Sequence, residues 1–165
     1  MNIRRLRHIW GILPVIFLIV SACSSVDCPM NNTVLTVYQL HKANGVVDTL
    51  KDSLSVISFQ HTPERDPVLL NKQANCSEFY LQVSYQHPQD SLFFVFQKAE
   101  EVDTVVIQKE NRSHFESVNC NPSFFHTITQ VDYTKHMIDS IVIKNREVTY
   151  DRSKAHFYIY LRADR

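Results

Sequence analysis

The sequence predicts an all-β domain, an antiparallel β-sandwich of the immunoglobulin-like type, with a small lipocalin-like β-barrel as the alternative. Three observations support this fold class. Apolar and polar residues alternate along many short segments, as in strands that bury one face. Turn-forming residues separate these segments at regular intervals. No window of helical length keeps a period of 3.6 residues.

The first 22 residues have the composition of a secretory signal and are set apart from the fold. A positive segment with three arginines precedes a short apolar core at 9–20, below the roughly 20 residues of a permanent span. The core ends in Val20-Ser21-Ala22-Cys23, which resembles the lipobox of bacterial lipoproteins. This resemblance implies that residues 1–22 are removed and that Cys23 carries acyl chains. The expected partner of the protein is therefore a membrane, which it binds through these acyl chains.

Ser24 follows the cysteine in place of the aspartate that retains many lipoproteins in the inner membrane. We therefore expect an outer-membrane anchor, and the single acid in 24–27 favours the periplasmic leaflet. The expected organisation is a leader at 1–22, a lipidated end and short tether at 23–32, and one sandwich domain at 33–165. The 143 residues left after the leader are enough to bury one core.

Three cysteines follow the lipidated one, namely Cys28, Cys76 and Cys120. Thiols outside the cytoplasm tend to oxidise, so one disulfide and one free thiol are expected. We favour Cys28–Cys120, because it would fix the tethered N-terminus to a late loop, and the sequence leaves the other pairings open. The cysteines form no C-x-x-C pair, so a disulfide is favoured over a structural zinc site.

The alternation is clearest at 79–86 and 156–162. Asn44-Gly45 predicts a type I′ hairpin turn after the first strand, because such a turn needs positive φ at both positions. The segment 98–102 leaves room for a short turn of helix. Further strands are expected at 33–40, 46–50, 54–60, 67–70, 92–97, 104–108, 124–131 and 140–144.

An Asp-Ser/Thr-aliphatic tripeptide recurs five times. In the favoured interpretation, Asp-Ser/Thr ends a turn and the aliphatic residue begins the next strand. The motif also resembles the acceptor site for O-linked glycans on exported proteins of some Gram-negative bacteria, and both interpretations can hold. The glycan acceptors would be Thr49, Ser53, Ser91, Thr104 and Ser140.

Catalytic signatures are missing from the sequence. It has no G-x-S-x-G, no glycine-rich phosphate loop and no H-E-x-x-H. His114 and Glu116 share a strand face, and His126 and His136 flank the next segment, without the spacing of a metal site. We predict no catalytic, cofactor-binding or metal-binding residue. The 14 basic and 17 acidic residues that follow the leader argue against a nucleic-acid partner.

Short motifs of low specificity occur in the second half of the chain, at 102–107, 114–115, 119–120, 125–126 and 138–143. They resemble those of a family of uncharacterised envelope lipoproteins, which share a lipobox leader, a cysteine soon after it and a later cysteine. Relatives often carry Cys-Gly where this chain has Cys120-Asn121, so the turn there is expected to differ. The resemblance implies no known activity.

We therefore expect a non-enzymatic, membrane-anchored module that binds or scaffolds an envelope protein. One alternative is a lipocalin-like carrier of an apolar small molecule, which predicts a closed sheet around a cavity. A second alternative is a hydrolase, which predicts a cleft that gathers an acid, a base or a metal from distant segments.

Overall fold

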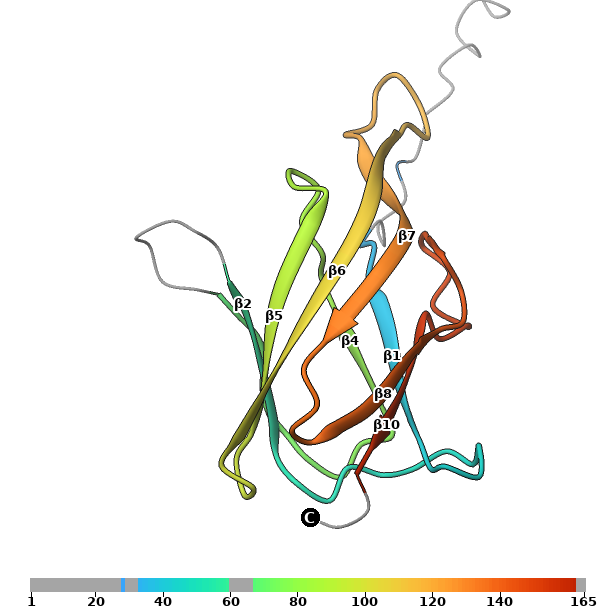
Figure 1. The fold of residues 1–165 in the computed structure, drawn as a ribbon. Coiled ribbons are helices and arrows are strands. Elements are labelled where there is room, and N and C mark those ends of the chain that lie inside the picture. The colour runs from blue at the N-terminus through green and yellow to red at the C-terminus, as the bar shows by residue number, and fades with distance from the viewer. Residues whose placement is uncertain (1–27, 29–32, 60–66, 163–165) are drawn as a thin grey trace, which may run out of the picture.

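The computed structural model describes residues 28, 33–59 and 67–162, and each regular element in them is a β-strand (Figure 1). These strands form two sheets packed as a sandwich, and one sheet is curled into a half-barrel. The predicted β-sandwich is confirmed, whereas the alternative of one closed barrel does not fit two separate sheets. No helix in the described ranges is long and apolar enough to cross a bilayer.

The smaller sheet has the strand order β4–β1–β10–β8. Its first and last strands along the chain, β1 and β10, are neighbours and run parallel, with Tyr38 opposite Phe157. The pairs β1–β4 and β8–β10 are antiparallel, so the parallel pair is a departure from the predicted arrangement. The strands are β1 (Thr36–His41), β4 (Glu78–Leu81), β8 (Ile138–Ile143) and β10 (Phe157–Leu161).

The larger sheet has the strand order β3–β2–β5–β6–β7–β9 and is antiparallel throughout. Its strands β5, β6 and β7 follow one another as a meander. β6 extends past the end of β5, which pairs with it only as far as Gln108, while the pairing with β7 continues to His114. The strands are β2 (Leu54–Phe59), β3 (Val68–Gln73), β5 (Gln89–Phe96), β6 (Glu101–His114), β7 (Ser123–Tyr133) and β9 (Glu147–Val148).

Aromatic side chains fill the centre of the core. The ring of Tyr38, fully buried, stacks on Phe79 at 5.0 Å and on Phe157 at 4.9 Å between centroids, and meets Phe94 edge-on at 6.1 Å. These contacts join the two sheets, because Phe94 belongs to β5 and the other three rings to the smaller sheet. Full burial of one such side chain contributes roughly 1.5–3 kcal/mol.

The predicted strand at 46–50 is wrong. Only Val47 pairs, in a single bridge with His41, because the chain then leaves the sheet to cross to the other layer. The turn before it is also not of type I′. Gly45 has a φ of 81°, but Asn44 is not among the residues with positive φ.

Two further expectations differ from the structure. The segment 98–102 holds a turn in place of a helix, because Glu100 adopts a φ of 55° and β6 begins at the next residue. The strand expected at 79–86 ends at Leu81. Beyond it the chain leaves the sheet, and the N–H of Ser84 donates instead to the carboxylate of Asp90 at 3.1 Å.

Candidate ligand-binding site

A cavity opens at the end of the sandwich where the β5–β6 turn, the β7–β8 turn and the crossover from β1 to β2 meet, at the bottom of Figure 1. Its volume is about 870 Å³. Its floor consists of the core side chains Leu50, Phe96 and Met137, each at most 5% exposed, together with the partly buried Ala99 and Leu161. We call it the Phe96 cavity. Solvent reaches this apolar floor mainly at Ala99 and Leu161, because the three core side chains are almost fully buried.

The rim of the Phe96 cavity is polar and has a net formal charge of +2. Lys42 is neutralised in part by an ion pair with Asp48 at 3.9 Å. Nζ of Lys98 donates to the carbonyl of Lys51 at 2.9 Å, a contact that positions the ammonium group without neutralising it. The charged rim residues are Lys42, Asp48, Lys51, Asp52, Lys98 and Arg162.

One wall of the cavity is the turn between β5 and β6, which Asp52 fixes. The side chain of Asp52 is buried, and its carboxylate accepts hydrogen bonds from the N–H groups of Lys98 at 2.8 Å and Ala99 at 3.1 Å. It also accepts from the N–H of Ser53. A carboxylate from the crossover segment therefore holds a turn that lies 46 residues away in the sequence.

The opposite wall is the turn between β7 and β8, which Asp103 fixes. This carboxylate is 0% exposed and accepts from the Thr134 hydroxyl at 2.7 Å and from the N–H groups of His136, Met137 and Ile138 at 2.8 Å each. Burial acts to raise the pKa of Asp103, but these hydrogen bonds outweigh it and hold that pKa below its usual value. The ionised carboxylate thus positions Met137 on the cavity floor.

The recurring Asp-Ser/Thr-aliphatic motif thus has a structural use that the sequence did not show. Two of its five aspartates, Asp52 and Asp103, each hold a distant turn through backbone N–H groups. Among the predicted glycan acceptors, Thr49 is exposed and lies on the rim of the Phe96 cavity. The other four are partly buried and lie beside β2 or within β5, β6 and β8; they are Ser53, Ser91, Thr104 and Ser140.

A second cavity, of about 520 Å³, lies toward the opposite end of the sandwich, and we call it the His126 cavity. Beside it a buried ion pair joins Nζ of Lys109 to Asp90 at 2.8 Å, and Nζ also donates to the carbonyl of His87 at 2.7 Å. The amide of Asn111 donates to the carbonyls of Tyr85 and His87 at 3.0 and 2.9 Å. The network attaches the segment after β4 to β6.

The ring of His126 completes this network. Because the amide nitrogen of Asn111 is donating, its Oδ1 accepts from Nδ1 of His126 at 2.8 Å. Burial, and secondarily the positive charge of Lys109, lower the pKa of His126 to about 4, so the ring is neutral at pH 7. The carboxylate of Asp90 is engaged by Lys109 and Ser84. Lys109, Asp90, Asn111 and His126 thus hold the segment after β4 against β6, and their polar atoms are engaged with one another. We call this network the brace.

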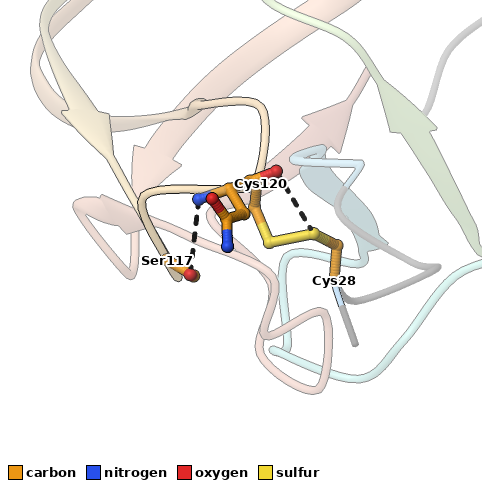
Figure 2. Close-up of a disulfide and its surroundings, with 4 residues drawn as sticks. Cys28, Ser117 and Cys120 are labelled. Atoms are coloured by element: carbon orange, nitrogen blue, oxygen red, sulfur yellow. Dashed lines mark hydrogen bonds between the residues drawn. A yellow bond between two sulfur atoms is a disulfide. The ribbon is translucent and has the colours of Figure 1, made fainter. Parts of the chain in front are cut away.

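Cys28 and Cys120 are joined by a disulfide, the pairing favoured from the sequence, and Figure 2 shows the bond at the loop between β6 and β7. The loop is closed locally by a hydrogen bond from the N–H of Cys120 to the carbonyl of Ser117 at 3.1 Å. Cys76 is a free, half-buried thiol whose pKa is raised by burial. The predicted lipidation site, Cys23, lies outside the described residues.

The structure does not bring the histidines named above together. His114 bonds Glu116 at 2.9 Å in the β6–β7 loop, while His136 lies 3.2 Å from the carboxylate of Asp103 and His126 bonds to Asn111. No group of three or more His, Cys, Asp or Glu side chains in the described residues is arranged to hold a metal ion.

The chain is similar to one family of proteins. No curated protein and no solved structure matches the chain. A family model matches residues 53–161, which include every strand from β2 to β10 and both walls of the Phe96 cavity. The match spans well over half of the chain. The protein therefore belongs to this family of unknown function, DUF6452.

Proposed function

We propose that this protein is an envelope lipoprotein, anchored by acyl chains on Cys23 to the periplasmic face of the outer membrane. Its sandwich acts there as a non-enzymatic binding module. The Phe96 cavity is the binding site, and its ligand is a small anionic amphiphile, such as a fatty acid or a lysophospholipid. The observation that carries this proposal is an apolar floor surrounded by a positively charged rim.

The anchor is supported by the leader and its Val20-Ser21-Ala22-Cys23 end. The disulfide between Cys28 and Cys120 adds support, because disulfides persist mainly in oxidising compartments such as the periplasm. Ser24 in place of aspartate favours the outer membrane.

The ligand class follows from the size and chemistry of the cavity. A volume of about 870 Å³ is within the range of about 300–1,000 Å³ that holds small molecules. The partly exposed side chains of Ala99 and Leu161 offer hydrocarbon contact, worth roughly 0.8 kcal/mol for each CH₂ group removed from water. The ammonium groups of Lys51 and Lys98 suit a carboxylate or phosphate head group.

A photoactivatable palmitate analogue, added to isolated envelopes that contain the full-length protein, tests this proposal. Crosslinks should map by peptide mass spectrometry to the segments around Leu50, Phe96 and Met137. The double variant Lys51→Glu/Arg162→Glu reverses two rim charges and should lower labelling about tenfold, as expected for two exposed charge contacts of about 0.7 kcal/mol each. Lys154→Glu, an exposed cation away from the cavity, is the matched control.

Labelling spread over other surfaces, or equally strong in the rim variant and the control, would contradict an amphiphile site. Crosslinking in the same envelopes also tests the scaffold form of a binding role. Recovery of one envelope protein, with no lipid adduct in the cavity, would favour a protein partner. The anchor is tested separately, because Cys23→Ser should abolish acylation and release the protein from membranes.

A further inference from the structure

The loop between β6 and β7 carries the two most exposed large apolar side chains in the described part of the protein. Val118 is 98% exposed and Phe115 is 61% exposed. Isolated apolar residues on a surface are ordinary, whereas these two share one loop tip and place apolar surface at a single point. We call residues 115–118 the apolar tip.

The apolar tip projects away from the body of the sandwich. Residues 109–114 of β6 extend past β5 and pair with β7, so the two strands form a ribbon at the top of Figure 1. Stacked rings lie at the outer end of the ribbon, beside the tip. The His114 ring lies 4.2 Å from that of Phe125, which meets Tyr150 edge-on at 5.0 Å.

The proposed lipid anchor lies close to this tip along the covalent chain. Cys28 is bonded to Cys120, which follows Val118 by two residues, and the two cysteine Cα atoms are 5.7 Å apart. Five residue steps separate Cys28 from Cys23, and a chain of that length spans at most about 18 Å. Cys120 is therefore tied to within about 24 Å of the Cα that carries the acyl chains, and the tip begins two residues from Cys120.

The charged groups around the tip have partners within the protein. Glu116 is hydrogen-bonded to His114 at 2.9 Å, and Arg112 pairs with Glu147 at 2.9 Å. Exposed apolar side chains held by a short tether beside lipid are positioned to enter the head-group region, where aromatic and aliphatic side chains anchor peripheral proteins.

We infer that the apolar tip docks on the membrane that holds Cys23, with Phe115 and Val118 inserted at its surface. This inference rests on the anchor proposed above. The membrane is thus contacted twice, by the acyl chains and by the tip. The Phe96 cavity is then held at the end of the sandwich that faces away from the bilayer (Figure 1).

A tryptophan reporter tests the inference. The sequence has a single tryptophan, Trp10, which lies in the leader, so Phe115→Trp gives the processed protein one reporter at the tip. Val46→Trp is the matched control, because Val46 is 56% exposed and belongs to the loop at the opposite end. Each purified lipoprotein is reconstituted into phosphatidylethanolamine–phosphatidylglycerol vesicles with and without acyl-chain-brominated lipid.

Tryptophan at 115 should emit at shorter wavelength than tryptophan at 46, and brominated lipid should quench it, while the control keeps its emission. Equal, unquenched emission at both sites would overturn the inference. A blue-shifted but unquenched reporter at 115 would overturn it too, since the tip would then be covered by protein. Intact mass separates the two claims, because unacylated protein refutes the anchor, whereas acylated protein without quenching refutes only the docking.

Discussion

Replacement of Asp103 by asparagine should destabilise the protein strongly, although the two side chains have nearly the same shape. Each carboxylate oxygen accepts two hydrogen bonds, Oδ1 from Thr134 and the N–H of His136, and Oδ2 from the N–H groups of Met137 and Ile138. In either orientation the amide of the introduced asparagine would turn an NH₂ group toward two of these donors.

The magnitude follows from those two lost bonds. Hydrogen bonds to a charged acceptor contribute about 1.5–3 kcal/mol each, so the loss is roughly 3–6 kcal/mol. We expect the lower end, about 3 kcal/mol, because residues 134–136 are exposed and water can replace part of the lost bonding. Urea denaturation at pH 7 measures this difference. Asp139→Asn, in the same motif but on an exposed side chain, is the control and should change the free energy of unfolding by less than about 0.5 kcal/mol.

The pH dependence gives a second readout of the same variant. The pKa of Asp103 is lowered in the folded state, so its stabilisation is complete above the unfolded carboxyl pKa of about 3.9 and is lost as the pH falls through the folded value. The gap between wild type and Asp103→Asn should therefore be constant from about pH 5 to 8 and narrow below about pH 4. A gap under about 1 kcal/mol at pH 7, or one that ignores acidification, would refute this account of the turn.

Four further predictions concern the brace, the disulfide and the motif. Lys109→Met leaves Asp90 as a buried unpaired charge and should cost about 3–5 kcal/mol in urea denaturation, largely recovered by adding Asp90→Asn; no recovery would show that the pair is not the cause. The pKa of His126 is about 4 in the folded state, so between about pH 6.5 and 4 only the unfolded chain binds a proton at this ring. The free energy of unfolding should therefore fall as the pH is lowered through that window, and it should fall less in His126→Gln. Equal pH dependence in wild type and variant would contradict a buried, neutral His126. Cys120→Ser opens a disulfide spanning 92 residues and should lower the free energy of unfolding by about 4–5 kcal/mol relative to oxidised wild type; reduced wild type is the control and should match the variant. If the motif accepts glycans, intact mass and peptide mapping should find them on the exposed Thr49 before the strand residues, and a mass equal to peptide plus lipid would dismiss glycosylation.

The fold class could be predicted because alternation is a local signal. In β5 the side chains of Leu92, Phe94 and Phe96 face the core, as the sequence pattern requires. β9 could not be found, since a strand of two residues, Glu147–Val148, has no period. The apolar run at 46–50 gave a false strand signal, because an apolar residue such as Leu50 can be buried while crossing between layers.

The candidate site was beyond the reach of sequence patterns for a different reason. The Phe96 cavity is built from four segments that are separated by most of the chain, at 42–52, 96–99, 137 and 161–162. Nothing in the spacing of Asp52 or Asp103 indicates which distant turn each one holds. The disulfide, by contrast, could be predicted from the sequence, because the small number of cysteines allows few pairings.

The parallel pairing of β1 with β10 sets a limit on when the protein can fold. β1 lies between β4 and β10, and β8 is joined to that sheet only through β10, so the sheet is in two halves until β10 arrives. If the chain crosses a membrane from the N-terminus onward, as the proposed export requires, β10 emerges after the other described strands. The smaller sheet can therefore close only after β10 has crossed, which leaves the chain in transit without the completed sandwich that would obstruct a narrow channel. Under the proposed export, the pairing of β1 with β10 would thus set when the smaller sheet can form.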